Sequence, residues 1–548
     1  MNNSLKFILG ALLVVVALGL AIPVMDIDAA QYASISSDML RSGKYLHVYD
    51  AGKEYLDKPP LLFWISACSM KLFGNNNFGY RLPSVLFAFL AVYATYRLTA
   101  LYYEKERARL AAVVLACSQG FVLMCHDVRT DTMLMGWVIF SVWQLARWAE
   151  ENKRSAFFWG CAGIAFGMMT KGPVALLVPG FAILPQLLFK KQIRIIFDWR
   201  MLAGILLIVA LLLPMSWGLY TQFDLHPEKN VNGSTNVSGL RFFYWTQSFG
   251  RITGESTWNN DAGILFLFQN MLWSFLPWIP LFVIALYMTI KQSWQSRLKH
   301  DQQKEIIALS GFVLSYLSLG LSKYQLPHYI FVAFPFAAIM TSGLLEKLTQ
   351  GELPTLKKYL TKSMMIVYVL LWTALVLLMQ FPFPDLSVIW TILAVAGTIG
   401  LFFLYKRYVT SKYRLIYISC YTILGLNLLL NAAFYPKLLE FQAGSMVGKW
   451  MKERHIPASK TGIYQFTMWR SLHFYADGII PQKDSLSTYQ KGDFLITTKE
   501  KMLEIGKERK IAVLFETPDY PITRLSLEFL QPEKRSRMLQ KVSLIQFR

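Results

Sequence analysis

Two carboxylates, Asp26 and Asp28, follow directly after the first long apolar run of the sequence. If that run crosses a membrane, a carboxylate at its end can face an aqueous cavity at the depth of the bilayer surface. There Asp28 could orient an acceptor that arrives with a lipid, or remove its proton as a general base. The alternative is that the two acids only mark the membrane boundary.

The motif Asp57-Lys58-Pro59-Pro60 places a lysine just before an apolar and aromatic segment. The two prolines fix the backbone ahead of a predicted interfacial helix over residues 61–73, which would lie on the membrane surface. Lys58 would then stand at the helix start near headgroup depth, where a cation can bind an anionic phosphate. A lysine that merely snorkels to the headgroups is the alternative.

Asp131 opens a later apolar run, two residues after Arg129. An acid at the end of a span favours a cavity over lipid, although an internal salt bridge with Arg129 would also satisfy it. Lys171 lies in a predicted tight turn, where it either faces the same side or only caps a helix. We expect Asp131 to support Asp28, with Arg129 and Lys171 in secondary roles.

Lys323 and Tyr329 flank the start of another apolar run. A lysine can pair with a phosphate and a tyrosine hydroxyl can hydrogen-bond to it. The alternative is an aromatic-belt tyrosine with a neighbouring lysine at the membrane interface. His328 is a supporting candidate only, because it forms no pair with another histidine at helical spacing and the sequence therefore does not indicate a metal site.

About thirteen apolar runs of spanning length must position these residues. A helix needs about 20 mostly apolar residues to cross the hydrocarbon core. The predicted spans lie near residues 7–25, 80–101, 108–125, 131–148, 156–170, 173–189, 201–220, 263–290, 305–321, 325–345, 363–381, 386–405 and 414–434. The first of them reads as an uncleaved anchor, since no convincing cleavage site follows it.

Basic residues cluster in short connections that all lie on one side if the spans alternate. These connections are residues 105–109, 153–154, 190–200, 291–304, 347–362 and 406–414. The positive-inside bias makes that side the cytoplasm, so the N-terminus is predicted inside and the C-terminus outside. The candidate residues then gather on the outer face.

The predicted outer face receives the loops 26–79 and 221–262 and a tail from residue 435. In the tail, an amphipathic stretch over 438–454 precedes strand-like runs at 461–466, 493–498 and 512–516, with a helical segment at 499–510. Alternating strand and helix patterns predict a small α/β domain. We therefore divide the chain into a transmembrane module, 1–434, and a C-terminal domain, 435–548.

The composition excludes several classes of protein. The 548 residues are 54% hydrophobic and only 16% charged, with a net charge of +21. Soluble domains average about 25% charged residues, so a disordered chain or an ordinary cytosolic enzyme is excluded. A nucleic-acid partner is not expected, because most basic residues stand between apolar runs, and the five scattered cysteines predict no disulfide framework.

The chemistry-bearing motifs occur in an order that resembles the GT-C class of membrane glycosyltransferases, in particular lipid A aminoarabinose transferase and its protein O-mannosyltransferase-like relatives. The matching motifs are Asp28 with Tyr32-Ala33, Gly43, Asp57-Lys58-Pro59-Pro60, Arg81-Leu82-Pro83-Ser84, Arg129-Thr130-Asp131, Thr170-Lys171-Gly172-Pro173 and Lys323-Tyr324-Gln325-Leu326-Pro327-His328-Tyr329. The resemblance covers about 345 N-terminal residues well. It implies a GT-C-like polytopic helical fold in a bacterial inner membrane, with the C-terminal domain in the periplasm.

The resemblance also implies roles for these residues. Lys58, Arg251, Lys323 and Tyr329 would bind the phosphate of a polyprenyl-phosphate sugar donor, Asp28 and Asp131 would be catalytic, and Asp57 would support Lys58. The acceptor would be lipid A, another envelope glycan or a protein. No cofactor is firmly indicated, and a divalent metal would be compatible with this chemistry but is not required by the sequence.

Three departures from the family pattern leave the sugar open. The family often has Asp-Glu where this chain has Asp28-Ala29, Glu-Lys-Pro where it has Asp57-Lys58-Pro59, and lysine where it has Gln325. A transporter or flippase of a lipid-linked sugar is the alternative function. Transporters usually place charged residues near the bilayer midplane within related halves, whereas these candidates gather at span ends, which favours an enzyme.

Overall fold

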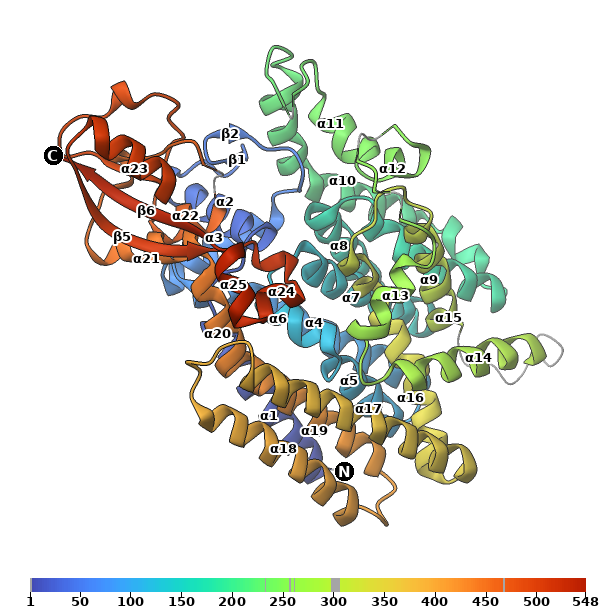
Figure 1. Cartoon of the computed structure of the whole chain (residues 1–548). Coiled ribbons are helices and arrows are strands. Elements are labelled where there is room, and N and C mark those ends of the chain that lie inside the picture. Colours follow the sequence, from blue (N-terminus) through green and yellow to red (C-terminus); the bar gives the residue numbers. More distant parts are fainter. Residues whose placement is uncertain (1, 232, 256–257, 261, 297–305, 467–468) are drawn as a thin grey trace.

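The computed structural model describes residues 2–231, 233–255, 258–260, 262–296, 306–466 and 469–548. Figure 1 shows a mostly helical body with a smaller unit of strands and short helices beside it, which contains the C-terminus. The first ten helices are α1 (Asn2–Ala21), α2 (Asp28–Ser42), α3 (Leu61–Phe73), α4 (Asn77–Tyr102), α5 (Lys105–Ala116), α6 (Gln119–His126), α7 (Thr130–Glu151), α8 (Arg154–Lys171), α9 (Val174–Phe189) and α10 (Trp199–Leu219).

The body continues with both short and long helices. They are α11 (Gly239–Arg241), α12 (Phe249–Thr253), α13 (Phe266–Ser274), α14 (Ile279–Ser296), α15 (Ile307–Gly320), α16 (Phe334–Gln350), α17 (Pro354–Gln380), α18 (Val388–Arg407), α19 (Arg414–Leu429) and α20 (Tyr435–Leu438). A 3₁₀ segment, Pro327–Ala333, leads directly into α16. Its first residue is a proline, which has no N–H. The first N–H of a helix has no partner within the helix, so a proline there costs no hydrogen bond.

Helix α7 is buried within the helical body, where it packs against α4, α8 and α9. It approaches α4 closely at Gly136, because a Cβ there would lie 2.7 Å from the carbonyl oxygen of Phe87. Asp131 lies in the first turn of this helix and is itself buried. Packing of α7 therefore fixes where the Asp131 carboxylate stands.

A tight turn joins α8 to α9. Gly172 has a φ of +96°, which favours glycine, and its N–H donates to the carbonyl oxygen of Met168 at 2.7 Å. Pro173 then starts the next helix. The turn predicted around Lys171 is confirmed, and it leaves that lysine as the last residue of α8.

The segment after α1 carries α2, a short hairpin and α3. Strands β1 (Tyr49–Asp50) and β2 (Lys53–Glu54) pair antiparallel between the two helices. The helix predicted over residues 61–73 is confirmed as α3, which starts directly after Pro59 and Pro60. Helices α2 and α3 pack on one another, so the hairpin between them is held close to the start of α3.

Seven described helical stretches are long and apolar enough to cross a membrane. They are Ser4–Ala21, Asn77–Tyr102, Trp199–Asp224, Pro327–Gln350, Pro354–Gln380, Val388–Arg407 and Arg414–Phe441. The pair α5 and α6, bent by 57°, would make an eighth if it is one broken span. Length and composition therefore support a polytopic helical membrane protein, in which seven or eight of the thirteen predicted spans are candidates by this criterion.

The difference in span number has a physical reason. The remaining predicted segments of the described chain are also helical, but α9 and α15 are only 16 and 14 residues long. The segment predicted as one span near 263–290 is divided into α13 and α14 around Leu276 and Pro277. Hydropathy alone does not separate a spanning helix from a shorter helix packed inside a helical body.

The C-terminal unit contains a four-stranded mixed sheet in the order β3-β4-β6-β5. The strands are β3 (Thr461–Ile463), β4 (Phe494–Thr498), β5 (Ile511–Asp519) and β6 (Gln540–Phe547), and the helices are α21 (Ala443–Glu453), α22 (Arg470–Tyr475), α23 (Lys499–Glu508), α24 (Leu527–Leu530) and α25 (Pro532–Met538). Strands β3 and β4 are parallel, whereas β6 is antiparallel to both of its neighbours. The predicted strands and the helix between the last two are confirmed, and β6 was not predicted.

The C-terminal unit is fastened to the segment that follows α1. Asp26 accepts hydrogen bonds from the Ser471 N–H at 3.0 Å and the Ser471 hydroxyl at 2.6 Å. Gln442 donates to the Val24 carbonyl and accepts from the Asp26 N–H, both at 2.9 Å. Burial, opposed by the Ser471 hydrogen bonds, raises the pKa of Asp26 to about 6.

This interface predicts an unusual dependence of stability on pH. An aspartate with a raised pKa binds its proton more tightly in the folded chain, so stability falls as pH rises from about 4 to about 6. Asp26→Asn removes the ionisation and still accepts from the Ser471 N–H, so thermal unfolding of the purified protein in detergent should depend less on pH across that range. Asp26→Leu, which loses both bonds, should destabilise by about 1–3 kcal/mol. An Asn variant that keeps the wild-type pH profile would contradict this.

Candidate active site

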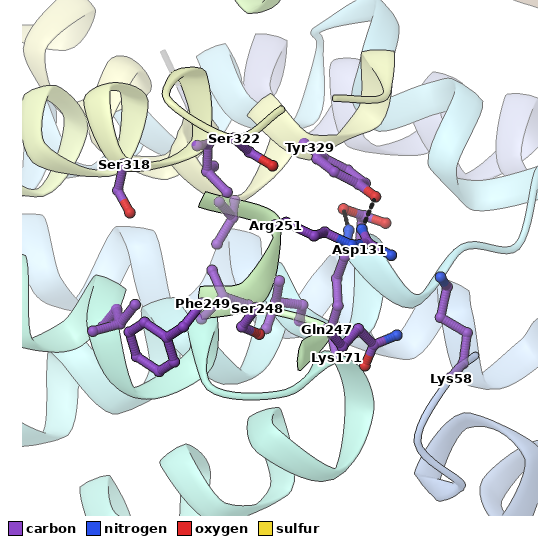
Figure 2. Close-up of a pocket in the computed structure, with 15 residues that line it drawn as sticks. Lys58, Asp131, Lys171, Gln247, Ser248, Phe249, Arg251, Ser318, Ser322 and Tyr329 are labelled. Carbon is purple, nitrogen blue, oxygen red and sulfur yellow. Dashed lines mark hydrogen bonds and ion pairs between the residues drawn. The ribbon is translucent and has the colours of Figure 1, made fainter. Parts of the chain in front are cut away.

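Three adjoining cavities lie where the ends of several helices meet. The cationic cavity is lined by Lys58, Asp131, Lys171, Arg251 and Tyr329, among others (Figure 2). The mixed-charge cavity shares Lys58 and Arg251 with it and adds Asp28, Gln31, Asp50, Glu54, Asp57 and Arg470. The carboxylate cavity shares Asp28 and His328 with the mixed-charge cavity and adds Asp127 and Arg129. Residues predicted from distant motifs are therefore brought to one place.

Two lysines of the cationic cavity are paired with carboxylates. Lys171 forms an ion pair with Asp131, and its Nζ lies 3.9 Å from the centre of the Tyr329 ring. The Lys58 Nζ lies 3.0 Å from Oδ2 of Asp57. Each lysine is thus held in position by an acid and still lines the cavity, so both can turn toward an incoming anion.

Arg251 differs from the two lysines because no acid compensates it. Its side chain is 8% exposed, and its Nη1 donates to the Tyr329 hydroxyl at 2.8 Å. Within the described part of the chain it forms no ion pair, and its Nε–H is buried without a hydrogen-bond partner. A buried cation is costly unless an anion compensates it, so the cavity is built to receive a negative group.

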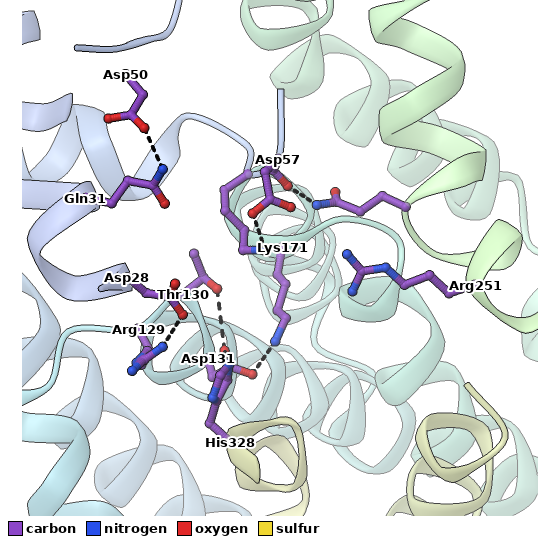
Figure 3. Close-up of polar contacts among 12 residues, drawn as sticks. Asp28, Gln31, Asp50, Asp57, Arg129, Thr130, Asp131, Lys171, Arg251 and His328 are labelled. Atoms are coloured by element: carbon purple, nitrogen blue, oxygen red, sulfur yellow. Dashed lines mark hydrogen bonds and ion pairs between the residues drawn. The ribbon is translucent and has the colours of Figure 1, made fainter. Parts of the chain in front are cut away.

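The Asp131 carboxylate serves two neighbours at once. Its Oδ1 pairs with Lys171, and its Oδ2 lies 3.5 Å from the Nε2 of His328 (Figure 3). The alternative ion pair with Arg129 does not form, because the Arg129 guanidinium binds two other acids. Asp131 therefore orients Lys171 and His328 at the wall shared by the cavities.

Arg129 joins two carboxylates that come from different segments. It pairs with Asp28, the first residue of α2 (Figure 3). Its Nε also lies 3.0 Å from Oδ2 of Asp127. The Asp28 side chain is 36% exposed and lines two of the three cavities. A half-exposed carboxylate held by a guanidinium is oriented and remains reachable by a substrate.

Lys323 is separated from the other predicted phosphate ligands. Its side chain is exposed and lines none of these three cavities, although its N–H donates to the Arg251 carbonyl at 3.1 Å. Gln325, which stands where the resembling family has lysine, is buried and donates to the carbonyl oxygens of Gly320 and Ser322. The role of the Lys323 side chain in phosphate binding stays a prediction.

Several residues of the site were not singled out from the sequence. Asp127 stands in the same short motif as Asp131 and could have been found there. Gln247, which donates to the main-chain carbonyl of Asp57, carries no sequence signal of its own. Gln31 and Asp50 meet within the segment that follows α1, whereas Arg470 reaches Asp50 only through the docking of the C-terminal unit, which no local pattern reveals.

The site offers no obvious set of metal ligands among the described residues. These residues contain no group of three or more His, Cys, Asp or Glu side chains arranged to hold an ion. The acids nearest the cavities are engaged by Lys58, Arg129, Lys171 and Arg470. The arrangement can bind an anion and orient carboxylates beside that anion. It can also hold a neutral part of a ligand between the anion and the carboxylates.

Sequence comparisons agree with the resemblance read from the motifs. Residues 57–217 match the family model described as dolichyl-phosphate-mannose-protein mannosyltransferase. Undecaprenyl phosphate-alpha-4-amino-4-deoxy-L-arabinose arabinosyl transferase 1 of Pseudomonas fluorescens is 30% identical over 348 residues, 61% of this chain and 57% of that relative. The enzyme of the same name from Pseudomonas aeruginosa strain PAO1 is 29% identical over 344 residues, with the same coverage. The matched segment thus spans just over half the length of these relatives.

Structural comparison extends the similarity to the whole fold. The crystal structure of ArnT from Cupriavidus metallidurans in the apo state has a TM-score of 0.74 and 14% identity, covering 99% of this chain and 98% of that one. The same protein bound to undecaprenyl phosphate gives 0.76 and 15%, with the same coverage. At this identity the likeness concerns the fold. The chain therefore resembles the aminoarabinose transferases and the mannosyltransferase family in sequence over its N-terminal part, and it shares the ArnT fold.

Proposed function

We propose that this protein transfers a sugar from a polyprenyl-phosphate-linked donor to an acceptor at the membrane surface. The observation that carries the proposal is the buried Arg251, which lines the cationic cavity beside Lys58 and Lys171 without an acid of its own among the described residues. A phosphate supplies the missing negative charge and accepts several hydrogen bonds. The names of the relatives and the ligand of the matched ArnT structure support a polyprenyl phosphate as its source.

The chemistry requires little of the leaving group. When the bond from the anomeric carbon to the phosphate oxygen breaks, the departing polyprenyl phosphate carries its charge well, because a phosphate monoester has a second pKa near 6. Lys58, Arg251 and Tyr329 would stabilise that charge, and Lys171 would add to it from its place on Asp131. Sugar transfer then depends on holding the two substrates in line.

The acceptor oxygen forms the new bond to the anomeric carbon. Asp28 would take the proton of a hydroxyl acceptor, whereas an acceptor that is itself a phosphate needs only orientation. Asp131 would act mainly by positioning Lys171 and His328, a smaller role than the sequence predicted. Lipid A, another envelope glycan or a protein remains the proposed acceptor, and the acceptor class decides whether Asp28 acts as a base.

A transfer assay tests this function. Purified protein is incubated with undecaprenyl phosphate sugars, including the 4-amino-4-deoxy-L-arabinose form, and with lipid A or other envelope acceptors. The proposal expects a glycosylated acceptor and released undecaprenyl phosphate. Movement of intact lipid-linked sugar across a vesicle, without any transfer, would instead show the alternative flippase.

Arg251→Gln tests the anion site directly. Loss of charge-assisted hydrogen bonds worth about 1.5–3 kcal/mol should weaken undecaprenyl phosphate binding by about 10- to 100-fold. Arg241→Gln is the matched control, because Arg241 lies in the same region but its side chain is 69% exposed and paired with Glu255 at 2.9 Å. Lys323→Gln tests the predicted role of Lys323 separately, and unchanged affinity would show that this side chain, which lines none of the three cavities, does not bind the phosphate. Equal affinity for the Arg251 variant and wild type would remove the assignment.

Asp28→Asn tests the proposed base. With a hydroxyl acceptor the rate of transfer should fall about 10²–10⁴-fold, and with a phosphate acceptor the loss should be smaller. Asp127→Asn is the proper control, because Asp127 binds the same guanidinium as Asp28 but lines only the carboxylate cavity. Asp26, the neighbour that the sequence would offer as a control, holds the C-terminal unit instead. Kinetics in which the Asp127 variant is the worse of the two would place the base elsewhere.

We also propose that the N-terminus is cytoplasmic and that the unit after residue 435 lies in the periplasm of a bacterial inner membrane. The charge of the basic connections supports this orientation, although most of the connection 291–304 lies outside the described residues. Reporters fused after Arg414 and after Gln442 flank the stretch Arg414–Phe441 and should report opposite sides. The same sidedness for both fusions would refute the orientation.

A further inference from the structure

Among the described residues of the C-terminal unit, Arg470 alone lines the mixed-charge cavity. Its Nη2 lies 3.1 Å from Oδ2 of Asp50 on the hairpin that precedes α3. The same oxygen accepts a hydrogen bond from the Gln31 Nε2 at 2.7 Å (Figure 3). One carboxylate oxygen therefore fixes an amide that comes from α2 and a guanidinium that comes from α22 of the C-terminal unit.

Asp50 serves as an anchor for these two side chains. It is 9% exposed, and its other oxygen, Oδ1, is buried without a hydrogen-bond partner in the described structure. Apart from Asp50, the side chains of Gln31 and Arg470 have no hydrogen-bond partner in the described part of the chain. The Nε–H of Arg470 is buried, so the amide oxygen of Gln31 and the other Nη N–H groups of Arg470 are left to bind a ligand.

The charge of the cavity indicates what that ligand is. Its four acids are all engaged, Asp28 by Arg129, Asp50 by Arg470, Glu54 by Lys229 and Asp57 by Lys58. The Gln31–Asp50–Arg470 corner is therefore close to neutral and does not attract a second phosphate as strongly as Arg251 does. A ligand part with several hydroxyl groups and no negative charge matches an amide oxygen next to fixed N–H donors.

Aromatic side chains line other parts of the same cavity. They are Tyr32, Tyr55, Trp258 and Tyr324, and the rings of Trp258 and Tyr324 lie 5.6 Å apart. Binding sites for small polar molecules combine such rings with a few fixed polar groups. The apolar face of a sugar ring can pack on the aromatic rings while its hydroxyls reach the polar corner.

From this geometry we propose that Gln31, Asp50 and Arg470 form a saccharide-binding subsite that the C-terminal unit completes. The subsite rests on the proposed function and extends it, because Lys58 and Arg251 line both this cavity and the cationic one. A sugar attached to a phosphate held by Arg251 would enter the mixed-charge cavity. The sugar ring of the acceptor is the other source of the same chemistry.

Binding measurements separate the subsite from the phosphate site. Full-length wild type, Gln31→Ala and Arg470→Gln are titrated with undecaprenyl phosphate and with undecaprenyl phosphate-4-amino-4-deoxy-L-arabinose. The variants should bind the sugar-bearing lipid about 5- to 30-fold more weakly than wild type, with unchanged affinity for undecaprenyl phosphate. Unchanged affinity for both lipids together with a similarly raised KM for lipid A assigns the subsite to the acceptor sugar.

Two controls keep the result interpretable. Arg41→Gln removes another ion pair with the C-terminal unit, to Asp477 at 3.2 Å, but Arg41 does not line the cavity, so its affinities should equal those of wild type. Gln31→Ala leaves the Asp50–Arg470 ion pair in place, so this variant still tests the subsite even if Arg470→Gln impairs folding. Equal loss for both lipids, equal loss in the Arg41 variant, or no change in either lipid affinity or acceptor KM would overturn the subsite. Failure of wild type to bind any of the lipids would instead reject the proposed function.

Discussion

Burying the Arg251 guanidinium removes water from a charged group, and other interactions must compensate for the lost hydration. The Tyr329 hydroxyl and the face of the Tyr324 ring, 5.2 Å from the guanidinium carbon, supply part of it. Both tyrosines lie in or beside the 3₁₀ segment ahead of α16, so the entry into that helix and the loop that carries Arg251 depend on one another. The positive charge of Arg251 is still not neutralised by an acid in the described part of the chain. Two lysines line the same cavity, and each is paired with its own carboxylate, so the cavity keeps a positive charge that an anion can neutralise.

The acids around the cavities follow one pattern. Three of them, Asp28, Asp50 and Asp131, bind a basic side chain from another segment of the chain. Asp57 binds its sequence neighbour, Lys58. Such pairs contribute little to stability when exposed, but partly buried pairs fix side chains in one orientation. Ion pairs between side chains of different segments, including α2, α7, α8 and the C-terminal unit, therefore hold the site together. This arrangement suits a reaction in which positioning matters more than proton transfer.

Local patterns in the sequence predicted much of this molecule. Alternation and apolar length located the long apolar helices and three of the four strands, but not α2 or α22, and Pro59-Pro60 and Gly172-Pro173 fixed two helix starts. Seven or eight of the thirteen predicted spans are long and apolar enough to cross a membrane, and the number beyond these stays a prediction, because helices such as α9 and α15 are apolar but short. Strand β6 was missed because its residues, Gln540 to Phe547, begin with a polar pair and gain their burial only between β4 and β5. For the site, types and motifs identified Lys58, Lys171 and Asp131, whereas the partners of Asp50 depend on tertiary docking.

The order of strands in the C-terminal sheet has a consequence for biosynthesis. β6 is the last strand to be made, yet it lies between β4 and β5 and pairs with both. Until Gln540–Phe547 has emerged, those two strands have no common neighbour and their inner edges stay open to other chains. The helical body, with the Gln31–Asp50 hydrogen bond, can thus be in place while the unit that carries Arg470 is still incomplete, so Arg470 is the last of the three side chains to join the polar corner.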